Sequence, residues 1–88
     1  TKVGVYWDTV RGATLYRIYR NTANDANTAT DVGTSAGNYY FDLTAVAGQA
    51  YFYWVRAENS VTSSSFSEPA SGRRANGNVF PGPFPPLD

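Results

Sequence analysis

A period of two residues governs the segment 50–59 (AYFYWVRAEN), and this pattern limits the fold of the 88-residue chain more than any other feature. Tyr51, Tyr53 and Val55 fall on one face of an extended chain, and Arg56 falls on the other. Successive side chains of a β-strand point to opposite faces, so we predict a strand with one buried face. Further strands are expected over residues 3–7, 15–20, 31–35, 38–43 and 65–74.

No stretch of useful length has the roughly 3.6-residue period of an amphipathic helix. The polar segment 21–30 is predicted to be a loop with room for one short helical turn. Gly12 and Gly48 mark turns between the apolar segments, because glycine adopts positive φ without cost. Short β segments separated by turns predict an all-β fold, a β-sandwich.

The composition changes sharply after Arg74. Residues 75–88 (ANGNVFPGPFPPLD) contain four of the five prolines of the chain. Proline-rich segments favour extended backbone and often connect domains. The sequence therefore predicts a sandwich over residues 1–74, followed by an extended proline-rich arm or linker over residues 75–88.

The composition excludes several classes of function. The chain has no Cys and no His, which removes disulfides, thiolate zinc sites and histidine-based proton transfer. Seven basic residues balance seven acidic ones, and this neutrality argues against nucleic-acid or anionic-membrane binding. No apolar run approaches the roughly 20 residues that span a bilayer, so no membrane insertion is expected.

The remaining polar residues form no catalytic motif. The seven carboxylates are scattered over different predicted loops and strands, and the serines at 63–65 have no histidine base. The loop around Asp25 and Asp31 is a poor match to a calcium loop and is interpreted as a solvated loop. We expect no metal, no cofactor and no enzymatic activity.

The inward positions of the predicted strands supply the core. They carry Val3, Val5, Trp7, Tyr16, Ile18, Tyr40, Tyr51, Tyr53, Val55 and Phe66. Burial of such a side chain contributes roughly 1.5–3 kcal/mol, before the cost in chain entropy. An aromatic core of this kind allows a small domain to fold without disulfides.

The order and spacing of these residues resemble fibronectin type III domains, in the form common in bacterial surface and secreted proteins. The matching segments are Val3-x-Val5-x-Trp7, Gly12-Ala13-x-x-Tyr16-x-Ile18-Tyr19-Arg20, Val32-Gly33-Thr34, Tyr40-x-Asp42, Gly48-x-x-Tyr51-x-Tyr53-x-Val55-x-Ala57-x-Asn59 and Ser65-Phe66-Ser67. The resemblance covers residues 1–74 and implies an immunoglobulin-like sandwich with Tyr51 at its tyrosine corner. It places the family's first strand, A, before Lys2, so we expect a sandwich with strand A missing.

In the fold that the resemblance implies, segments 15–20 and 50–59 are neighbours. Their outward positions then form a candidate binding face of Arg17, Tyr19, Phe52, Trp54 and Arg56. Three interpretations stay open for this face: a stacked surface of Arg stems and rings, a contact patch for a neighbouring subunit, or a platform for carbohydrate.

Without strand A, the strand that carries Val3 and Val5 would have an open edge, which is a template for an incoming strand. A tail folded back on its own domain would run parallel to that strand. The tail of a neighbour in a head-to-tail row would arrive in the direction of strand A itself. The candidate tail contacts are Val79, Phe80, Phe84 and Leu87.

The residues favour a non-catalytic structural module, and the resemblance implies that it belongs to a secreted or cell-surface protein. Its role would be spacing, or head-to-tail self-association into a filament in which the tail completes the neighbour's sandwich. Expected partners are copies of the same chain or adjacent domains. The alternative is a carbohydrate- or protein-binding accessory module of a larger extracellular protein or enzyme.

Overall fold

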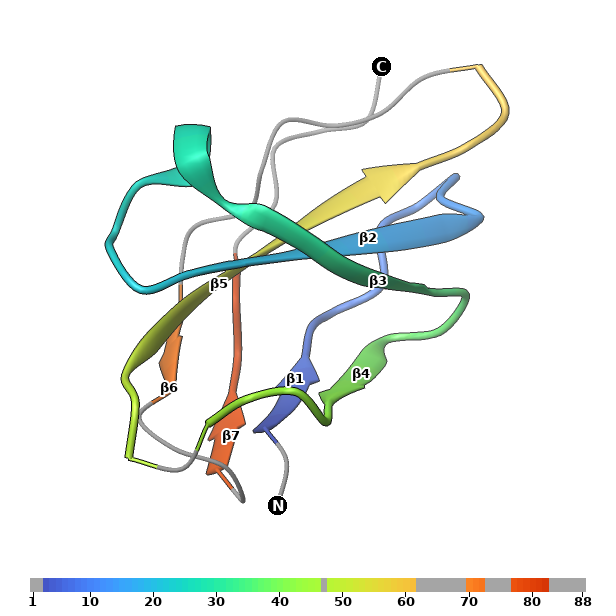
Figure 1. Cartoon of the computed structure of the whole chain (residues 1–88). Helices are drawn as coiled ribbons and strands as arrows, with labels where there is room; N and C mark the ends of the chain where they lie inside the picture. Colours follow the sequence, from blue (N-terminus) through green and yellow to red (C-terminus); the bar gives the residue numbers. More distant parts are fainter. Residues whose placement is uncertain (1–2, 47, 62–69, 73–76, 83–88) are drawn as a thin grey trace.

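The computed structural model describes residues 3–46, 48–61, 70–72 and 77–82. The strands are β1 (Val3–Tyr6), β2 (Leu15–Asn21), β3 (Thr30–Ser35), β4 (Tyr39–Asp42), β5 (Tyr51–Glu58), β6 (Ala70–Gly72) and β7 (Gly77–Val79), and one short 3-10 helix, η1, covers Ala26–Thr28 (Figure 1). The predicted all-β character is confirmed, and η1 is the short helical turn expected in the loop of residues 21–30.

The strands form two sheets. One has four strands in the order β3-β2-β5-β6, and all its neighbours are antiparallel. The other has three strands in the order β4-β1-β7, where β1 is antiparallel to β4 and parallel to β7. Gly12 and Gly48, where turns were predicted, both adopt a φ of 87°.

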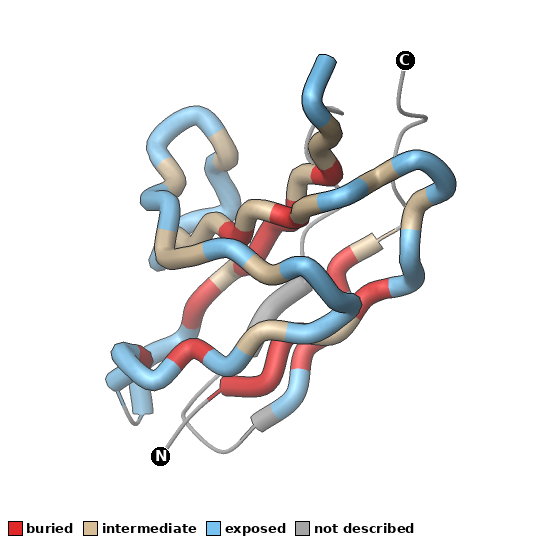
Figure 2. The backbone as a smooth tube through the Cα atoms, turned by 90° about the vertical axis from the view of Figure 1, so that its right-hand side faces the viewer, coloured by how far each residue is buried: buried red, intermediate tan, exposed pale blue. Residues whose placement is uncertain are grey.

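One hydrophobic core lies between the two sheets, as the buried stretches of the backbone show (Figure 2). Its buried members are Val3, Val5, Trp7, Tyr16, Ile18, Ala45, Tyr51, Tyr53, Val55, Ala57 and Val79. Alternation along β1, β2 and β5 predicted most of these positions correctly, because each strand turns one face to the core.

Two predicted core residues have other outcomes. Tyr40 is half-buried and packs against the edge of the core, where its hydroxyl donates a hydrogen bond to the Val32 carbonyl at 2.6 Å. The Tyr40 ring lies against Gly33, and a Cβ at Gly33 would overlap the Tyr40 hydroxyl. Phe66 lies outside the described residues, as does Pro69 in the same predicted strand.

Residues 77–79, which were predicted to belong to an extended arm or linker over residues 75–88, form a strand of the sheet instead. Gly77, Asn78 and Val79 pair in register with Val3, Gly4 and Val5, so β7 is an edge strand of the sandwich. The Val79 side chain is 2% exposed and belongs to the core. β7 runs parallel to β1, the direction expected of a tail that folds back on its own domain.

Shortening the Val79 side chain tests whether β7 is part of the folded core. We expect Val79→Ala to lower the free energy of unfolding by about 2 kcal/mol, because it removes buried methyl groups and leaves a cavity. Urea denaturation measures the change, and Val46→Ala is the control because Val46 is 62% exposed. Equal effects of the two substitutions would contradict the docking of β7.

Candidate functional site

The face predicted for binding lies on the outer side of β2 and β5. The register places Arg17 opposite Arg56 and Tyr19 opposite Trp54. Phe52 lies beside Trp54 along β5, with 6.4 Å between ring centroids. The structure therefore brings all five predicted residues together on one face.

Trp54 differs from the expectation of a solvent-exposed ring, because only 3% of its surface is exposed. The residue is nevertheless not a member of the core cluster between the sheets. It lies in the middle of β5, an interior strand with β2 on one side and β6 on the other. With so little of its surface exposed, Trp54 offers little to a ligand.

The charged residues of this face already have partners within the chain. Arg17 forms ion pairs with Asp31 at 3.0 Å and with Glu58 at 3.1 Å. The hydrogen bonds that Arg17 donates to Glu58 and Asp31 hold the pKa of Arg17 above its usual value. The Arg56 guanidinium lies over the Tyr19 ring, 5.5 Å from its centroid. These contacts favour the interpretation as a stacked surface.

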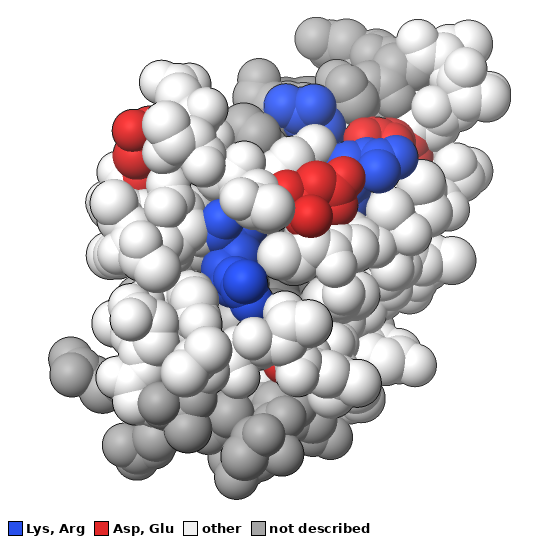
Figure 3. Space-filling model, viewed as in Figure 1, with Lys and Arg blue, Asp and Glu red and all other residues white. Residues whose placement is uncertain are grey.

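The distribution of charge agrees with that interpretation. Figure 3 shows basic and acidic side chains next to one another on the face it presents. The fields of neighbouring opposite charges largely cancel beyond a short distance from the surface. Little field therefore remains to attract a charged partner.

Of the predicted tail contacts, Val79 lies at the predicted open edge of the same chain. Val3 and Val5 are fully buried, and β7 occupies the edge of β1 beside them. Val79 is buried, whereas Phe80 is 68% exposed. Phe84 and Leu87 lie outside the described residues.

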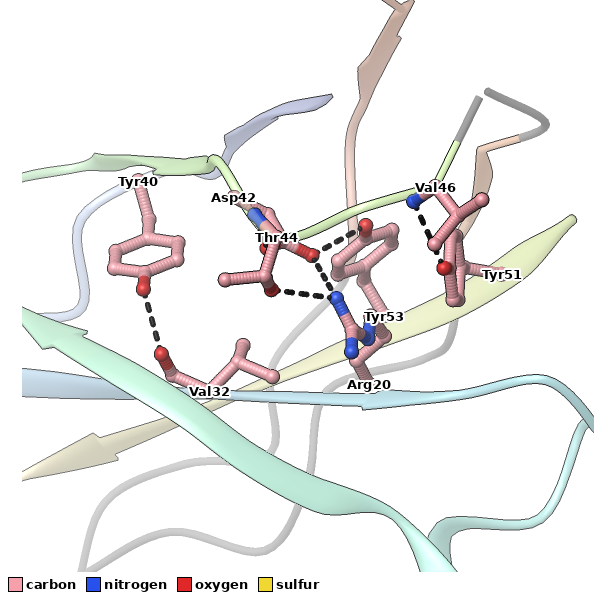
Figure 4. A network of polar contacts seen from close by, with 8 residues as sticks. All are labelled: Arg20, Val32, Tyr40, Asp42, Thr44, Val46, Tyr51 and Tyr53. Atoms are coloured by element: carbon pink, nitrogen blue, oxygen red, sulfur yellow. Dashed lines mark hydrogen bonds and ion pairs between the residues drawn. The ribbon is translucent and has the colours of Figure 1, made fainter. Parts of the chain in front are cut away.

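A buried polar network joins the two sheets at the end of β4 (Figure 4). The Asp42 carboxylate is 1% exposed and accepts hydrogen bonds from Arg20 Nη1 and from the Tyr53 hydroxyl, both at 2.8 Å. It also accepts from the Thr44 backbone N–H at 3.0 Å and from the Thr44 hydroxyl at 2.7 Å. The carboxylate thus connects β4 to β2, β5 and the following turn.

The network fixes the charge states of its members. Burial alone would raise the pKa of Asp42, but hydrogen bonds from Thr44, Arg20 and Tyr53 outweigh it and hold that pKa below its usual value. Burial and the bond to Asp42 raise the pKa of the Tyr53 hydroxyl well above its usual value. Asp42 is therefore a charged structural anchor and a poor proton donor or acceptor for catalysis.

Sequence reasoning gave Asp42 no functional role beyond its place in the family-like segment Tyr40-x-Asp42. Arg20 was the sign of the network in the sequence, because alternation along β2 places it on the same core-facing side as Tyr16 and Ile18. A guanidinium on the core side of a strand requires a buried partner, because an unpaired charge there is costly.

A second contact stabilises the turn that follows the network. The Val46 backbone N–H donates to the Tyr51 hydroxyl at 3.0 Å, which links the start of β5 to the loop before it. The Arg20 guanidinium lies over the Tyr51 ring at 4.6 Å from the centroid.

The described residues offer no metal centre. Among them, no group of three or more His, Cys, Asp or Glu residues is placed to hold an ion. In the predicted solvated loop, the Asp25 carboxylate accepts a hydrogen bond from the Asn27 N–H, and the Asn21 amide donates to the Asp25 carbonyl. The part of the chain that the structure describes also contains no helix long and apolar enough to cross a bilayer.

Four aromatic residues meet on the outer side of the three-stranded sheet, and of these only Phe80 was singled out from the sequence, as a candidate tail contact. They are Tyr6, Tyr39, Phe41 and Phe80, and together they are called the aromatic row below. Their positions depend on strand pairing between distant parts of the chain, which periodicity alone does not reveal.

Comparison with known proteins assigns no role to any of these residues. No protein-family model matches the chain. Searches of curated proteins and of solved structures likewise find no significant match.

Removing the charge of Asp42 tests the network. We expect Asp42→Asn to lower the free energy of unfolding at pH 7 by about 3 kcal/mol, because it leaves the Arg20 guanidinium without its counter-charge. Asp31→Asn is the control, since the Asp31 side chain is 42% exposed and its loss costs less than about 1 kcal/mol.

The comparison of wild type with Asp42→Asn also predicts how the free energy of unfolding depends on pH. The pKa of Asp42 is lower in the folded than in the unfolded chain, so the contribution of its charge is present above the unfolded pKa of about 3.9. That contribution is lost as the pH falls through the folded pKa. Urea titrations between pH 7 and pH 2.5 should show the gap between wild type and Asp42→Asn narrowing below about pH 4. A constant gap would contradict the assignment.

Proposed function

We propose that the chain is a non-catalytic structural module of a secreted or cell-surface protein, with the immunoglobulin-like sandwich of fibronectin type III domains. The observation that carries the proposal is the closure of the β1 edge by β7 of the same chain. The edge of the sheet is then β7, a strand of three residues, and a short edge strand is a poor template for other chains. This suits a module that separates its neighbours in a row.

The strand order supports the resemblance to fibronectin type III domains. If β1 corresponds to strand B of that family, then β2, β3, β4, β5 and β6 correspond to C, C′, E, F and G. The four-stranded sheet then reads C′-C-F-G, an order also found in immunoglobulin-like sandwiches. The hydrogen bond between the Tyr51 hydroxyl and the Val46 N–H has the form of a tyrosine corner. The proposed extracellular location rests on this resemblance.

Head-to-tail association is a second candidate function, and the shortness of the β1–β7 pairing favours it. Among the described residues of the tail, only Gly77, Asn78 and Val79 pair with β1, and they do so in parallel, the slightly less stable arrangement. Release of β7 would free the backbone of β1 to pair with the tail of a neighbouring copy. That tail could add in the antiparallel direction of strand A and complete the neighbour's sandwich.

An accessory binding module is the remaining alternative. On the face formed by β2 and β5, Trp54 is buried and the Arg17 charge is neutralised by two carboxylates. A ligand there would have to replace contacts that the chain already makes, so this face supports binding less well than it supports stability.

Molar mass as a function of concentration tests the proposal. Light scattering coupled to size-exclusion chromatography, from about 10 μM to 1 mM, should show monomers for a spacer and a growing series of oligomers for head-to-tail exchange. If oligomers form, Val79→Asp should abolish them, because a carboxylate cannot enter the core of either copy. Val61→Asp is the control, since Val61 is 87% exposed.

Each outcome separates the two candidates. Monomers throughout, with intact far-UV circular dichroism, would contradict self-association and favour spacing. Oligomers that persist in Val79→Asp would contradict strand exchange as their cause.

A further inference from the structure

The outer side of the β4-β1-β7 sheet carries a continuous set of exposed rings. Tyr39 is 50% exposed, Phe41 37% and Phe80 68%, while Tyr6 is half-buried between its neighbours. Pairing of β1 with β4 sets Tyr6 opposite Tyr39 and Gly4 opposite Phe41. The aromatic row therefore crosses the sheet from β4, over β1, to the residue that follows β7.

The rings contact one another in sequence. The centroids of Tyr39 and Phe41 are 5.3 Å apart, those of Phe41 and Tyr6 are 6.3 Å apart, and those of Tyr6 and Phe80 are 5.8 Å apart. Tyr6 and Phe80 are stacked with 29° between their planes. Ring contacts of this kind hold the side chains in place before any ligand arrives, which lowers the entropic cost of binding.

Gly4 explains how the Tyr6 ring can lie over the strand. A Cβ at Gly4 would come within 2.7 Å of both the Tyr6 ring and the Asn78 side-chain oxygen. The absence of a side chain at this position leaves room for the Tyr6 ring next to the backbone of β1.

An open hollow adjoins the end of the aromatic row that Tyr6 and Phe80 form. It has a volume of about 520 Å³, and its lining includes Tyr6, Phe80, Asp8, Asn38 and Pro81. Asp8 and Asn38 are exposed, and neither side chain forms a hydrogen bond or an ion pair with another described residue. The hollow, which Trp7 also lines, thus combines aromatic side chains with the Asp8 carboxylate and the Asn38 amide.

We propose that the aromatic row and this hollow form a binding site for a neutral pyranose oligosaccharide. Ring faces carry negative potential and attract the weakly positive C–H groups on a face of a sugar ring. The Asp8 carboxylate accepts hydrogen bonds from sugar hydroxyls, while the Asn38 amide both donates and accepts. The several rings across the sheet suit a ligand of several sugar units.

The chemistry of the hollow distinguishes this ligand from two others. No Lys or Arg is among the residues that line the hollow, so the Asp8 charge would repel an anionic ligand. A proline-rich peptide, such as the segment 81–88 of another copy, also suits aromatic grooves. Proline has no backbone N–H, however, and such a peptide offers few donors to Asp8.

Affinity electrophoresis of the full 88-residue chain tests the proposal. Native gels containing hydroxyethyl cellulose, xylan, glucomannan or glycol chitin should retard the chain in at least one case. We expect Tyr39→Ala and Phe80→Ala each to weaken the retarding interaction at least fivefold, since stacking of a single ring is worth about 1 kcal/mol or more. Asp8→Asn should weaken it without altering the fold, because Asp8 is exposed.

Two control variants keep the test specific. Val61→Ala removes an exposed apolar side chain that does not line the hollow, and Tyr19→Ala removes a ring from the face formed by β2 and β5. Both should be retarded as strongly as wild type. Circular dichroism and thermal unfolding of every variant will distinguish loss of the site from loss of the fold.

Several outcomes would overturn the inference. These are no retardation by any of the four polysaccharides, or equal retardation of wild type, Tyr39→Ala and Phe80→Ala. Binding of a synthetic peptide of residues 81–88 without any binding of polysaccharide would assign the aromatic row to a proline-rich partner. Loss of retardation in Tyr19→Ala alone would assign the site to the opposite sheet. Failure of the polysaccharide test would leave the pairing of β7 with β1, and with it the spacer proposal, untouched.

Discussion

The Asp42 carboxylate is the contact on which the arrangement of the two sheets depends. It lies at the end of β4 in the three-stranded sheet, yet its hydrogen bonds reach Arg20 on β2 and Tyr53 on β5 in the other. Apolar packing between sheets is non-directional and permits one sheet to slide over the other. A buried carboxylate with four hydrogen bonds specifies a single alignment, because any shift would leave a charge without partners.

The same alignment places the features that the two proposals use. It sets the inner face of β1 against the core, so that Val79 of β7 can join Val3 and Val5 there. The outer face of β1 then presents Tyr6 beside rings from β4 and from the chain after β7. The position of β1 therefore determines both the pairing of its edge with β7 and the assembly of the aromatic row.

Much of the fold could be predicted from the sequence because β-strands convert period two directly into buried and exposed faces. Trp7, Tyr16, Ile18 and Tyr53 were assigned to the core on that basis, and all are buried. The pattern does not report on a side chain's neighbours within the sheet, which explains why the burial of Trp54 was not foreseen. Its strand lies in the interior of the sheet, between β2 and β6, a position that the local sequence does not reveal.

The sites were harder to predict because they depend on pairing between distant segments. Tyr6 and Phe80 are far apart in the chain, and nothing in the local sequence of either residue indicates their contact. β7 is only three residues long and lies next to a proline-rich stretch, so composition concealed it. Arg20 at an inward position was the one local sign of the Asp42 network.

The parallel direction of β1 and β7 has a mechanical consequence. Tension that enters at the start of β1 and leaves at the end of β7 would pull the two strands past each other along their length. All the backbone hydrogen bonds between them would then carry the load together, in shear, whereas strands peeled apart from one end lose their bonds one at a time. The parallel arrangement is slightly less stable at equilibrium. Under tension between these two strand ends, however, it resists longer than strands that peel apart from one end.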